Sequence, residues 1–333
     1  MGDLPDAVDR ARLDSLVNNL VNRPVTDGVT NALVVVAGGR IVVEWYPPGV
    51  TETTTHISWS MAKSITHALV GIAVGDGLLD ADATDLLPTW RGDDRSAISL
   101  RHLMMMRSGL LWVEDYVDDT KSDVIEMLFG ESANTGDHAA YAASKPLAHA
   151  PGTHWEYSSG TTNIVARILA DALGEPSGSH DAFLSFMNSR LFAPIGMTAA
   201  PKFDRAGTFV GSSFVYATAR DFARFGYLYL CGGEWGGNRI LPAGWVGECA
   251  VSHAIEDESG MGYGQHWWTR PGDPGSMIAQ GYEGQFTWVS PRHDVVLVHL
   301  GKTPAEYGNP LRSQLDAIVS EFPVRMESVR HDG

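Results

Sequence analysis

Apolar residues recur at helical spacing in two segments near the start of the chain. Between residues 7 and 21 this spacing predicts a helix with one buried face, formed by Val8, Ala11, Leu16 and Leu20. A second helix is predicted after residue 60, where Ile65, Leu69 and Ile72 repeat with the same period. Glycines at 75 and 77 mark the expected end of that helix.

Between these two helices the pattern changes to runs of β-branched and apolar residues. Residues 32–37 and 40–45 form two such runs, and the only residues between them are Gly38 and Gly39. Two glycines in this position are typical of a tight hairpin, because its turn requires positive φ angles. We therefore predict an antiparallel pair of strands here.

The rest of the chain divides into a helical stretch and a second β-rich stretch. From residue 78 to about 200 the pattern predicts helices and long loops, with no convincing alternating strand and with helices over 100–106, 161–173 and 181–192. Thr218 and Asp221 match a capping box that opens a helix ending near Leu230. Strands are then predicted over 262–268, 276–280, 285–290 and 295–300, followed by a helix over 310–322.

This order of elements favours an α+β fold. An antiparallel sheet built from both chain ends and flanked by helices, with a mostly helical domain inserted between its two halves, satisfies the pattern. We assign residues 1–80 and 200–333 to the sheet domain and residues 81–199 to the inserted helical domain.

Composition and charge restrict the classes of function. The chain has 333 residues, 44% of them apolar, as is typical of a folded protein with a substantial core. Its net charge of −16, without a cluster of Lys or Arg, argues against a nucleic-acid partner. No apolar run reaches the ~18 residues of a membrane span, and the N-terminus lacks the features of an export signal, so we expect a soluble, cytoplasmic protein. Cys231 and Cys249 are expected to be free thiols, and no spacing of residues indicates a metal site or another cofactor.

The first chemical feature is Ser60-Met-Ala-Lys63, at the start of the second predicted helix. Residues three apart share one helix face, so the two side chains can meet. A serine in a first helical turn lies beside backbone N–H groups that favour negative charge, and a lysine shielded from water can lose its proton near neutral pH. Most Ser-x-x-Lys pairs are ordinary helix surface, but this chain has only five lysines, and no other follows a serine at this spacing.

Two further segments offer partners for this pair. Tyr157 lies in a loop before a helix; near an ammonium group its pKa should fall, so that it could take the serine proton. In Gly281-Tyr-Glu-Gly284-Gln285 the glycines permit close approach of a ligand, and a strand N–H could bind an oxyanion. Taken alone, Tyr157 is more simply a buried tyrosine with one hydrogen bond, which is the commoner situation, and the glycine segment equally fits a turn.

Together the three segments resemble the signatures of the serine β-lactamase-like and penicillin-binding-protein-like superfamily. Those signatures are Ser-x-x-Lys, Tyr-x-Asn/Ser and Lys-Thr-Gly or His-x-Gly. Here they read Ser60-Met-Ala-Lys63, Tyr157-Ser-Ser159 and Tyr282-Glu-Gly284, in the same order. The resemblance covers roughly residues 30–320, and it implies the α+β fold predicted above.

The resemblance also implies roles for these residues. Ser60 would attack a carbonyl carbon and form an acyl-enzyme, while Lys63 and Tyr157 would share the roles of base and acid. The backbone N–H groups of Ser60 and Gln285 would bind the oxyanion. Ser159 would orient Lys63 or the substrate.

A loop in the helical stretch narrows the resemblance. Leu110-Leu-Trp112-Val-Glu-Asp-Tyr116 is similar to the Glu-Asp-Tyr loop of 6-aminohexanoate-dimer hydrolases and related carboxylesterases, whose loop tyrosine contacts the scissile amide. Tyr116 could then donate to a leaving nitrogen, and Trp112 could supply an apolar wall. The remaining substrate contacts would come from Tyr282 and Gly284.

Two features concern the charge of the substrate. Tyr282 stands where the superfamily has a cationic residue or histidine, so no lysine there would grip the carboxylate of a β-lactam or of a peptidoglycan stem. Four acidic residues of the loop could attract a cationic amine, although we expect each to be a solvated side chain: Glu114, Asp115, Asp118 and Asp119.

We therefore expect a serine hydrolase that cleaves small esters or linear amides, with esters favoured because their leaving groups need less protonation. One alternative is a β-lactamase or D-amino-acid peptidase of the same fold. Another is a non-catalytic binding or sensor domain, against which the joint presence of Ser60, Lys63 and Tyr157 argues. The expected partner is a small-molecule substrate, with no nucleic acid and no membrane.

Overall fold

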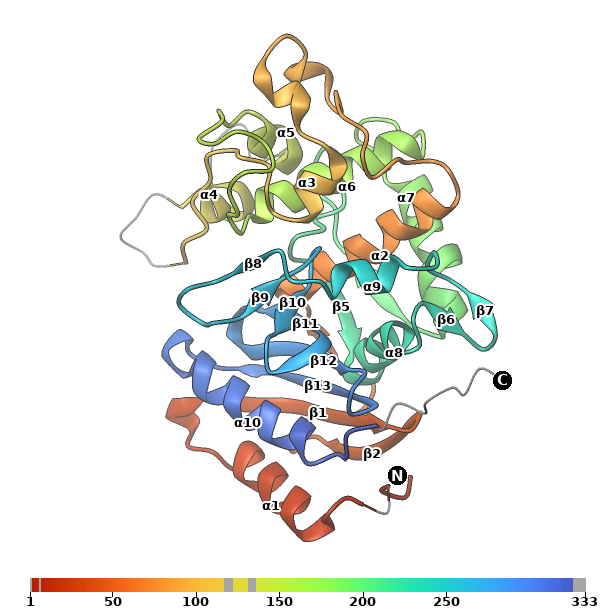
Figure 1. The fold of residues 1–333 in the computed structure, drawn as a ribbon, viewed down its shortest axis with the longest axis vertical. Helices are drawn as coiled ribbons and strands as arrows, with labels where there is room; N and C mark the ends of the chain where they lie inside the picture. The colour runs from red at the N-terminus through yellow and green to blue at the C-terminus, as the bar shows by residue number, and fades with distance from the viewer. Residues whose placement is uncertain (1, 6, 117–121, 131–135, 326–333) are drawn as a thin grey trace, which may run out of the picture.

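An eight-stranded antiparallel sheet forms the lower half of the molecule in Figure 1, and both ends of the chain contribute to it. This computed structural model describes residues 2–5, 7–116, 122–130 and 136–325. The strands of the sheet are β1 (Val29–Ala37), β2 (Arg40–Trp45), β8 (Ala254–Ile255), β9 (Gly262–Tyr263), β10 (Trp268–Arg270), β11 (Asp273–Gly281), β12 (Gln285–Ser290) and β13 (Val295–Lys302). Their order is β2-β1-β13-β12-β11-β10-β9-β8, which confirms the predicted sheet from both chain ends.

The central strands of the sheet are buried on both faces. Along β1, Leu33 and Val35 belong to one hydrophobic core, whereas Val34 and Val36 belong to the other, as expected from the alternation of side chains in a strand. The predicted hairpin is present: Gly38 and Gly39 connect β1 to β2 with φ angles of 55° and 74°.

Helices from distant parts of the sequence cover the two faces. On one face lie α1 (Arg10–Val21) and α10 (Gly308–Ser320), which contact each other and lie side by side in Figure 1. On the other face lies α8 (Ala219–Leu230), opened by the predicted capping box of Thr218 and Asp221. Beyond α8, α2 (Ala62–Gly75) runs between the sheet and the helical half of the molecule. These helices match the predicted segments to within a few residues.

The upper half of the molecule is mostly helical, as predicted (Figure 1). It contains α3 (Leu100–Met104), α4 (Asp123–Phe129), α5 (His138–Ala143), α6 (Ser159–Ala172) and α7 (Asp181–Met187), the last continuing into a π-helical turn, Asn188–Phe192. The amphipathic helix α6 packs against α2, α3, α4 and α5. The division of the chain at residues 80 and 200 stays a prediction.

Several short strands were not predicted. A second sheet joins β3 (Thr55–Ile57), β5 (Val215–Thr218) and β4 (Ala199–Pro201) in that order, and each strand is too short to show an alternating pattern. A small hairpin, β6 (Glu234–Trp235) and β7 (Asn238–Arg239), precedes α9 (Trp245–Cys249). The strand predicted over 262–268 is wrong, because the chain turns back between β9 and β10, with His266 at a φ angle of 54°.

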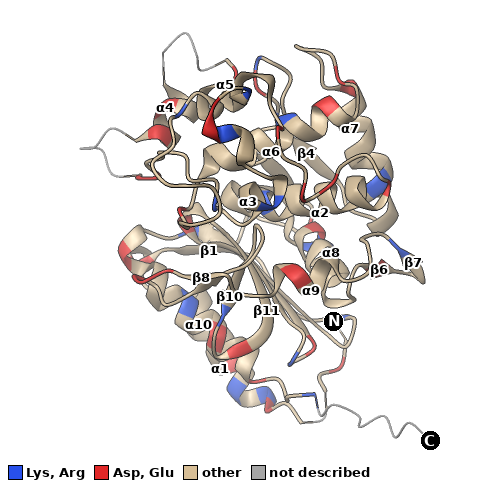
Figure 2. Ribbon diagram, turned by 45° about the horizontal axis from the view of Figure 1, so that its top comes forward, with Lys and Arg blue, Asp and Glu red and all other residues tan. Residues whose placement is uncertain are grey.

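Charge and thiols follow the sequence-based expectations where the structure describes them. Lys and Arg positions are spread over the helical half and the sheet half of the ribbon (Figure 2). Cys231 and Cys249 are both free thiols. In the described ranges, no helix combines the length and the apolar character needed to cross a membrane.

The contact between α8 and the sheet depends on a glycine. A Cβ atom at Gly226 would lie 2.6 Å from Cγ1 of Val296 and 2.8 Å from Cγ2 of Thr287, so Gly226→Ala should force the helix away from β12 and β13. We expect this substitution to lower the free energy of unfolding by about 1–3 kcal/mol, although alanine is the better helix former. Urea unfolding measures the effect.

The matched control is Gly247→Ala in α9, where an added Cβ would meet no atom within 4 Å. It should leave stability unchanged or raise it by up to about 1 kcal/mol. Equal destabilisation by the two substitutions would contradict the close packing of α8.

Candidate active site

Ser60 lies in a strained turn at the entrance to α2. The turn spans Trp59–Met61, and Trp59 has a φ angle of 44°, a left-handed conformation that is unfavourable for a bulky side chain. Surrounding contacts hold the turn in place: the Ser58 N–H donates to the Val215 carbonyl oxygen (2.8 Å), and the Ser58 hydroxyl donates to the Trp59 carbonyl oxygen (2.9 Å). Strain of this kind is found where a functional side chain must be held in one place.

The structure brings Ser60 and Lys63 together, as their spacing predicts. Lys63 is 1% exposed, and its Nζ lies 3.0 Å from the Ser60 Oγ, 2.9 Å from the Ser159 Oγ and 3.1 Å from the carbonyl oxygen of Ser212. Ser159 belongs to the first turn of α6, and Ser212 precedes β5. The amine therefore lies where α2, α6 and the chain before β5 converge.

Burial gives this lysine an unusual protonation equilibrium. Removal from water lowers the pKa of Lys63 from 10.5 to about 8, and the negative charge of Glu114 acts in the opposite direction. A substantial fraction of Lys63 is therefore neutral near pH 8. At pH 7 most of Lys63 still carries its proton, so the loss expected near neutral pH is centred about one pH unit higher.

Glu114 is the residue of the site that the sequence analysis misjudged. Instead of a solvated loop side chain, it accepts four hydrogen bonds. Its Oε1 accepts from the Ser159 hydroxyl (2.5 Å) and the Tyr116 hydroxyl (2.8 Å), and its Oε2 accepts from the Trp112 Nε1 (2.6 Å) and the Ser159 N–H (2.8 Å). Its position, two residues after Trp112 and two before Tyr116, is the only sequence signal that could have indicated this role.

These bonds fix the direction of each proton around Lys63. The Ser159 hydroxyl donates to Glu114, so its oxygen can only accept from Lys63, and the Ser212 carbonyl oxygen is an acceptor by nature. A neutral amine then uses both of its N–H groups on these two acceptors. Its lone pair is left to point at the Ser60 hydroxyl, which is the arrangement a base requires.

A further polar residue supports Ser212 from behind. Asn163 is fully buried on α6, and its Oδ1 accepts from the Ser212 N–H (3.2 Å). The sequence analysis did not identify it. The helix α6 is buried along most of its length, and a polar asparagine within such a helix was the sequence signal that could have identified this residue.

Tyr157 joins the site in a different state from the one predicted. Its ring centroid lies 4.8 Å from the Lys63 Nζ and stacks at 5.4 Å on the ring of Trp268. Burial and the charge of Glu114 raise the pKa of Tyr157 well above its ordinary value, although a hydrogen bond with Ser60 acts in the opposite direction. The expected fall of its pKa is therefore wrong, and Tyr157 keeps its proton.

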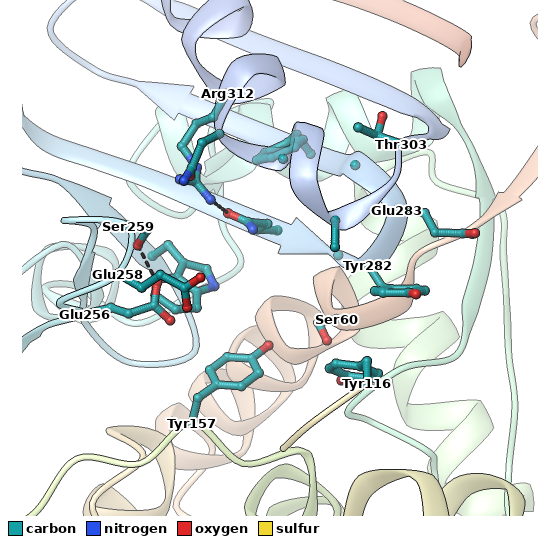
Figure 3. A pocket seen from close by; sticks show the side chains of 18 of the residues that line it. Ser60, Tyr116, Tyr157, Glu256, Glu258, Ser259, Tyr282, Glu283, Thr303 and Arg312 are labelled. Atoms are coloured by element: carbon teal, nitrogen blue, oxygen red, sulfur yellow. Dashed lines mark hydrogen bonds between the residues drawn. The ribbon is translucent and has the colours of Figure 1, made fainter. Parts of the chain in front are cut away.

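The pocket beside Ser60 has a volume of about 450 Å³. Tyr116, Tyr157, Tyr282 and Gly284 line it, and Figure 3 shows Ser60 among the three tyrosines. The rings of Tyr116 and Tyr282 stack at a centroid distance of 5.1 Å, so the helical half and the sheet half of the molecule meet beside Ser60.

Four predicted site residues do not line the pocket: Lys63, whose contacts are given above, Trp112, Ser159 and Gln285. Trp112 is 6% exposed and belongs to the core behind the site, where its indole packs closely over Gly160 and holds Glu114, so it supplies no apolar wall. Ser159 is fully buried and contacts Lys63, which makes it a positioning residue for the lysine. Gln285 is 2% exposed and pairs with Gly281 across the β11–β12 hairpin, away from the pocket lining.

The other acidic residues of the loop have different positions. Asp115 lines the pocket, whereas Asp118 and Asp119 lie outside the described residues. Within the described part of the chain, no group of three or more His, Cys, Asp or Glu side chains is arranged to hold a metal ion.

Comparisons with known proteins define the class to which this site belongs. A model of the beta-lactamase family matches residues 13–314, so the chain belongs to that family, which has a serine-hydrolase fold. The resemblance drawn from the three motifs is therefore confirmed. The chain is 27% identical over 310 residues to the 6-aminohexanoate-dimer hydrolase of Paenarthrobacter ureafaciens, a match that covers 88% of this chain and 78% of that protein.

Solved structures agree with this assignment. A protein of Bacillus anthracis, provisionally described as a 6-aminohexanoate-dimer hydrolase, is similar with a TM-score of 0.73 and 23% identity, over 87% of this chain and 79% of that chain. A family VIII carboxylesterase is similar with a TM-score of 0.70 and 15% identity, over 97% and 99% of the two chains. At these identities the likeness shows a shared fold.

The charge of Glu114 should control the protonation of Lys63. Covalent labelling of Ser60 by a fluorophosphonate requires the neutral amine, so its rate should rise with pH through a midpoint of about 8. In Glu114→Gln the charge that raises the lysine pKa is removed, and the midpoint should move to lower pH. Intact-protein mass spectrometry across a pH series measures both midpoints.

Glu258→Gln is the matched control, because Glu258 also lines the pocket but is not among the groups that shift the lysine pKa. Its midpoint should equal that of the unmodified protein. A midpoint in Glu114→Gln that stays unchanged or rises would contradict the role given to Glu114.

Proposed function

We propose that this protein is a serine hydrolase that cleaves small carboxylic esters or linear amides through an acyl-enzyme on Ser60. The observation that carries this proposal is the chain of contacts from Ser60 through Lys63 and Ser159 to Glu114. It holds a buried amine of lowered pKa against the serine hydroxyl, which is the requirement for an activated nucleophile.

In the first step, neutral Lys63 takes the hydroxyl proton while the Ser60 Oγ forms a bond to the carbonyl carbon of the substrate. The carbonyl oxygen becomes an oxyanion, and the backbone N–H of Ser60 is one donor for it. For the second donor we propose Tyr282 in place of Gln285. Tyr282 lines the pocket and directly follows Gly281, where a Cβ atom would lie only 2.3 Å from the carbonyl oxygen of Ser58.

In the second step, the bond to the leaving group breaks and the leaving atom receives a proton. Tyr157 keeps its proton and lines the pocket beside Ser60, so it is the group placed to donate. Lys63 holds the proton that it took from Ser60 and passes it to Tyr157, which restores the tyrosine hydroxyl. Attack of a water molecule on the acyl-enzyme repeats these transfers and releases the acid.

The choice between ester and amide depends on the leaving group. An ester needs less help from a proton donor, so we propose esterase activity as the general activity. The similarity to 6-aminohexanoate-dimer hydrolase supports linear amides as a second class of substrate. Amide cleavage would use the Tyr116 hydroxyl, which now donates to Glu114 (2.8 Å) and would have to turn towards the leaving nitrogen.

The alternative of a non-catalytic binding domain is disfavoured by the lysine itself. A fully buried lysine with a lowered pKa reduces the stability of the fold, and such groups concentrate at catalytic sites. A β-lactamase or D-amino-acid peptidase remains the second candidate within the family. The absence of a cationic side chain at Tyr282 weighs against it.

The direct test is hydrolysis of p-nitrophenyl acetate and butyrate by Ser60→Ala. We expect kcat/KM to fall by about a thousand-fold or more, because the acyl-enzyme can no longer form. Ser189→Ala, at an exposed serine of the helical half, is the control and should retain full activity. Undiminished hydrolysis by Ser60→Ala would overturn the proposed mechanism.

A further inference from the structure

The pocket beside Ser60 is rich in negative charge but contains one positively charged side chain. Five carboxylate residues line it: Glu114, Asp115, Glu256, Glu258 and Glu283. Arg312 of α10 is the only Lys, Arg or His among the described residues of the lining. In Figure 3, Arg312 enters from the side of the pocket opposite Tyr157 and lies well apart from Ser60.

The guanidinium of Arg312 has no carboxylate partner in the described part of the chain. Its Nη1 donates to the Asn309 Oδ1 (2.6 Å) and its Nη2 to the Gln280 Oε1 (3.3 Å), and both acceptors are neutral amides. Its Nε is buried and has no hydrogen-bond partner. Arg312 also lines an adjacent cavity, and there, by contrast, its neighbour Arg270 forms an ion pair with Asp316 at 2.6 Å.

This arrangement is unfavourable unless a ligand completes it. Burial lowers the pKa of Arg312, and the charge of Glu256 acts in the opposite direction without forming an ion pair. A half-buried cation with an unused donor loses solvation that its neutral partners do not replace. A carboxylate is the ligand that matches both the charge and the planar N–H groups of a guanidinium.

The position of Arg312 connects it to the substrate path. Gln280, which accepts from Arg312, is followed in β11 by Gly281, and Gly281 passes against the turn that carries Ser60. A molecule that lies along this end of β11 can therefore reach both Ser60 and Arg312. A structural role in holding Gln280 and Asn309 would not require a charge, since a neutral side chain can donate to an amide oxygen.

We propose that Arg312 binds a carboxylate group of the substrate at a distance from the scissile bond, and that the preferred substrates are esters or amides with a free carboxylate. This inference rests on the proposed hydrolase function. The five carboxylates of the lining repel an anion elsewhere in the pocket, so contact with Arg312 also fixes the direction in which the substrate lies. Arg312 does not take the place of the cation missing at Tyr282, because it comes from α10 and lies well apart from Ser60.

The test compares charged and neutral members of two series of esters. In the first, mono-p-nitrophenyl esters of linear dicarboxylic acids carry the carboxylate on the acyl side. Their neutral partners are the same p-nitrophenyl esters with the second carboxyl group methylated. In the second, acetate esters of hydroxyphenylalkanoic acids carry it on the leaving group, and their methyl esters are the neutral partners. The quantity measured is the ratio of kcat/KM for the charged ester to kcat/KM for its neutral partner.

We expect one of the two series to show a preference for the charged ester at a suitable chain length. In Arg312→Gln that ratio should fall by about tenfold or more, mainly through KM, and Arg312→Lys should restore part of it. Arg270→Gln is the matched control, since it removes a neighbouring arginine outside this pocket, and it should leave the ratio unchanged. Thermal unfolding shows that each variant is folded.

The inference is overturned if neither series shows a preference for the charged ester, or if the preference survives in Arg312→Gln. Failure of the proposed function has a different signature. In that case the neutral esters themselves would not be cleaved in a Ser60-dependent manner, whereas failure of the Arg312 contact alone would leave that cleavage intact.

Discussion

The site depends on the burial of one amine. Lys63 is almost completely removed from water, and this burial lowers its pKa to about 8. Burial alone would not make it a base, because a neutral amine can also turn its lone pair away from the serine. The two fixed acceptors, Ser159 and Ser212, remove that freedom. The Glu114 carboxylate acts one step further back by fixing the direction of the Ser159 hydroxyl.

The need to bury the Lys63 amine and to fix its hydrogen-bond acceptors explains how the two halves of the fold contribute to the site. Lys63 comes from α2, which runs between the two halves, whereas Ser159 comes from α6 and Glu114 from the loop before α4, so the helical half supports the base. The sheet half brings the β11–β12 hairpin against the strained turn of Ser60, through the close approach of Gly281 to Ser58. The stacked rings of Tyr116 and Tyr282 join the halves at the pocket.

The features that could be predicted from the sequence are those determined by residues close together along the chain. The Ser60–Lys63 spacing, the capping box at Thr218 and the turn at Gly38-Gly39 each depend on a few consecutive positions. What the sequence could not show depends on contacts between distant segments. The interior position of Glu114 results from contact with α6, 45 residues along the chain, and the short β3-β5-β4 sheet has too few residues for a pattern. The raised pKa of Tyr157 likewise follows from burial against Trp268.

The most direct measurement of the central claim is an NMR titration of the lysine side chains. The chain has only five lysines, so a protein labelled with [ε-13C]lysine gives a spectrum simple enough to assign. One signal should titrate with a pKa of about 8 and be missing in Lys63→Arg. If the signal that is missing in Lys63→Arg does not titrate near pH 8 in the unmodified protein, Lys63 is not the base described here.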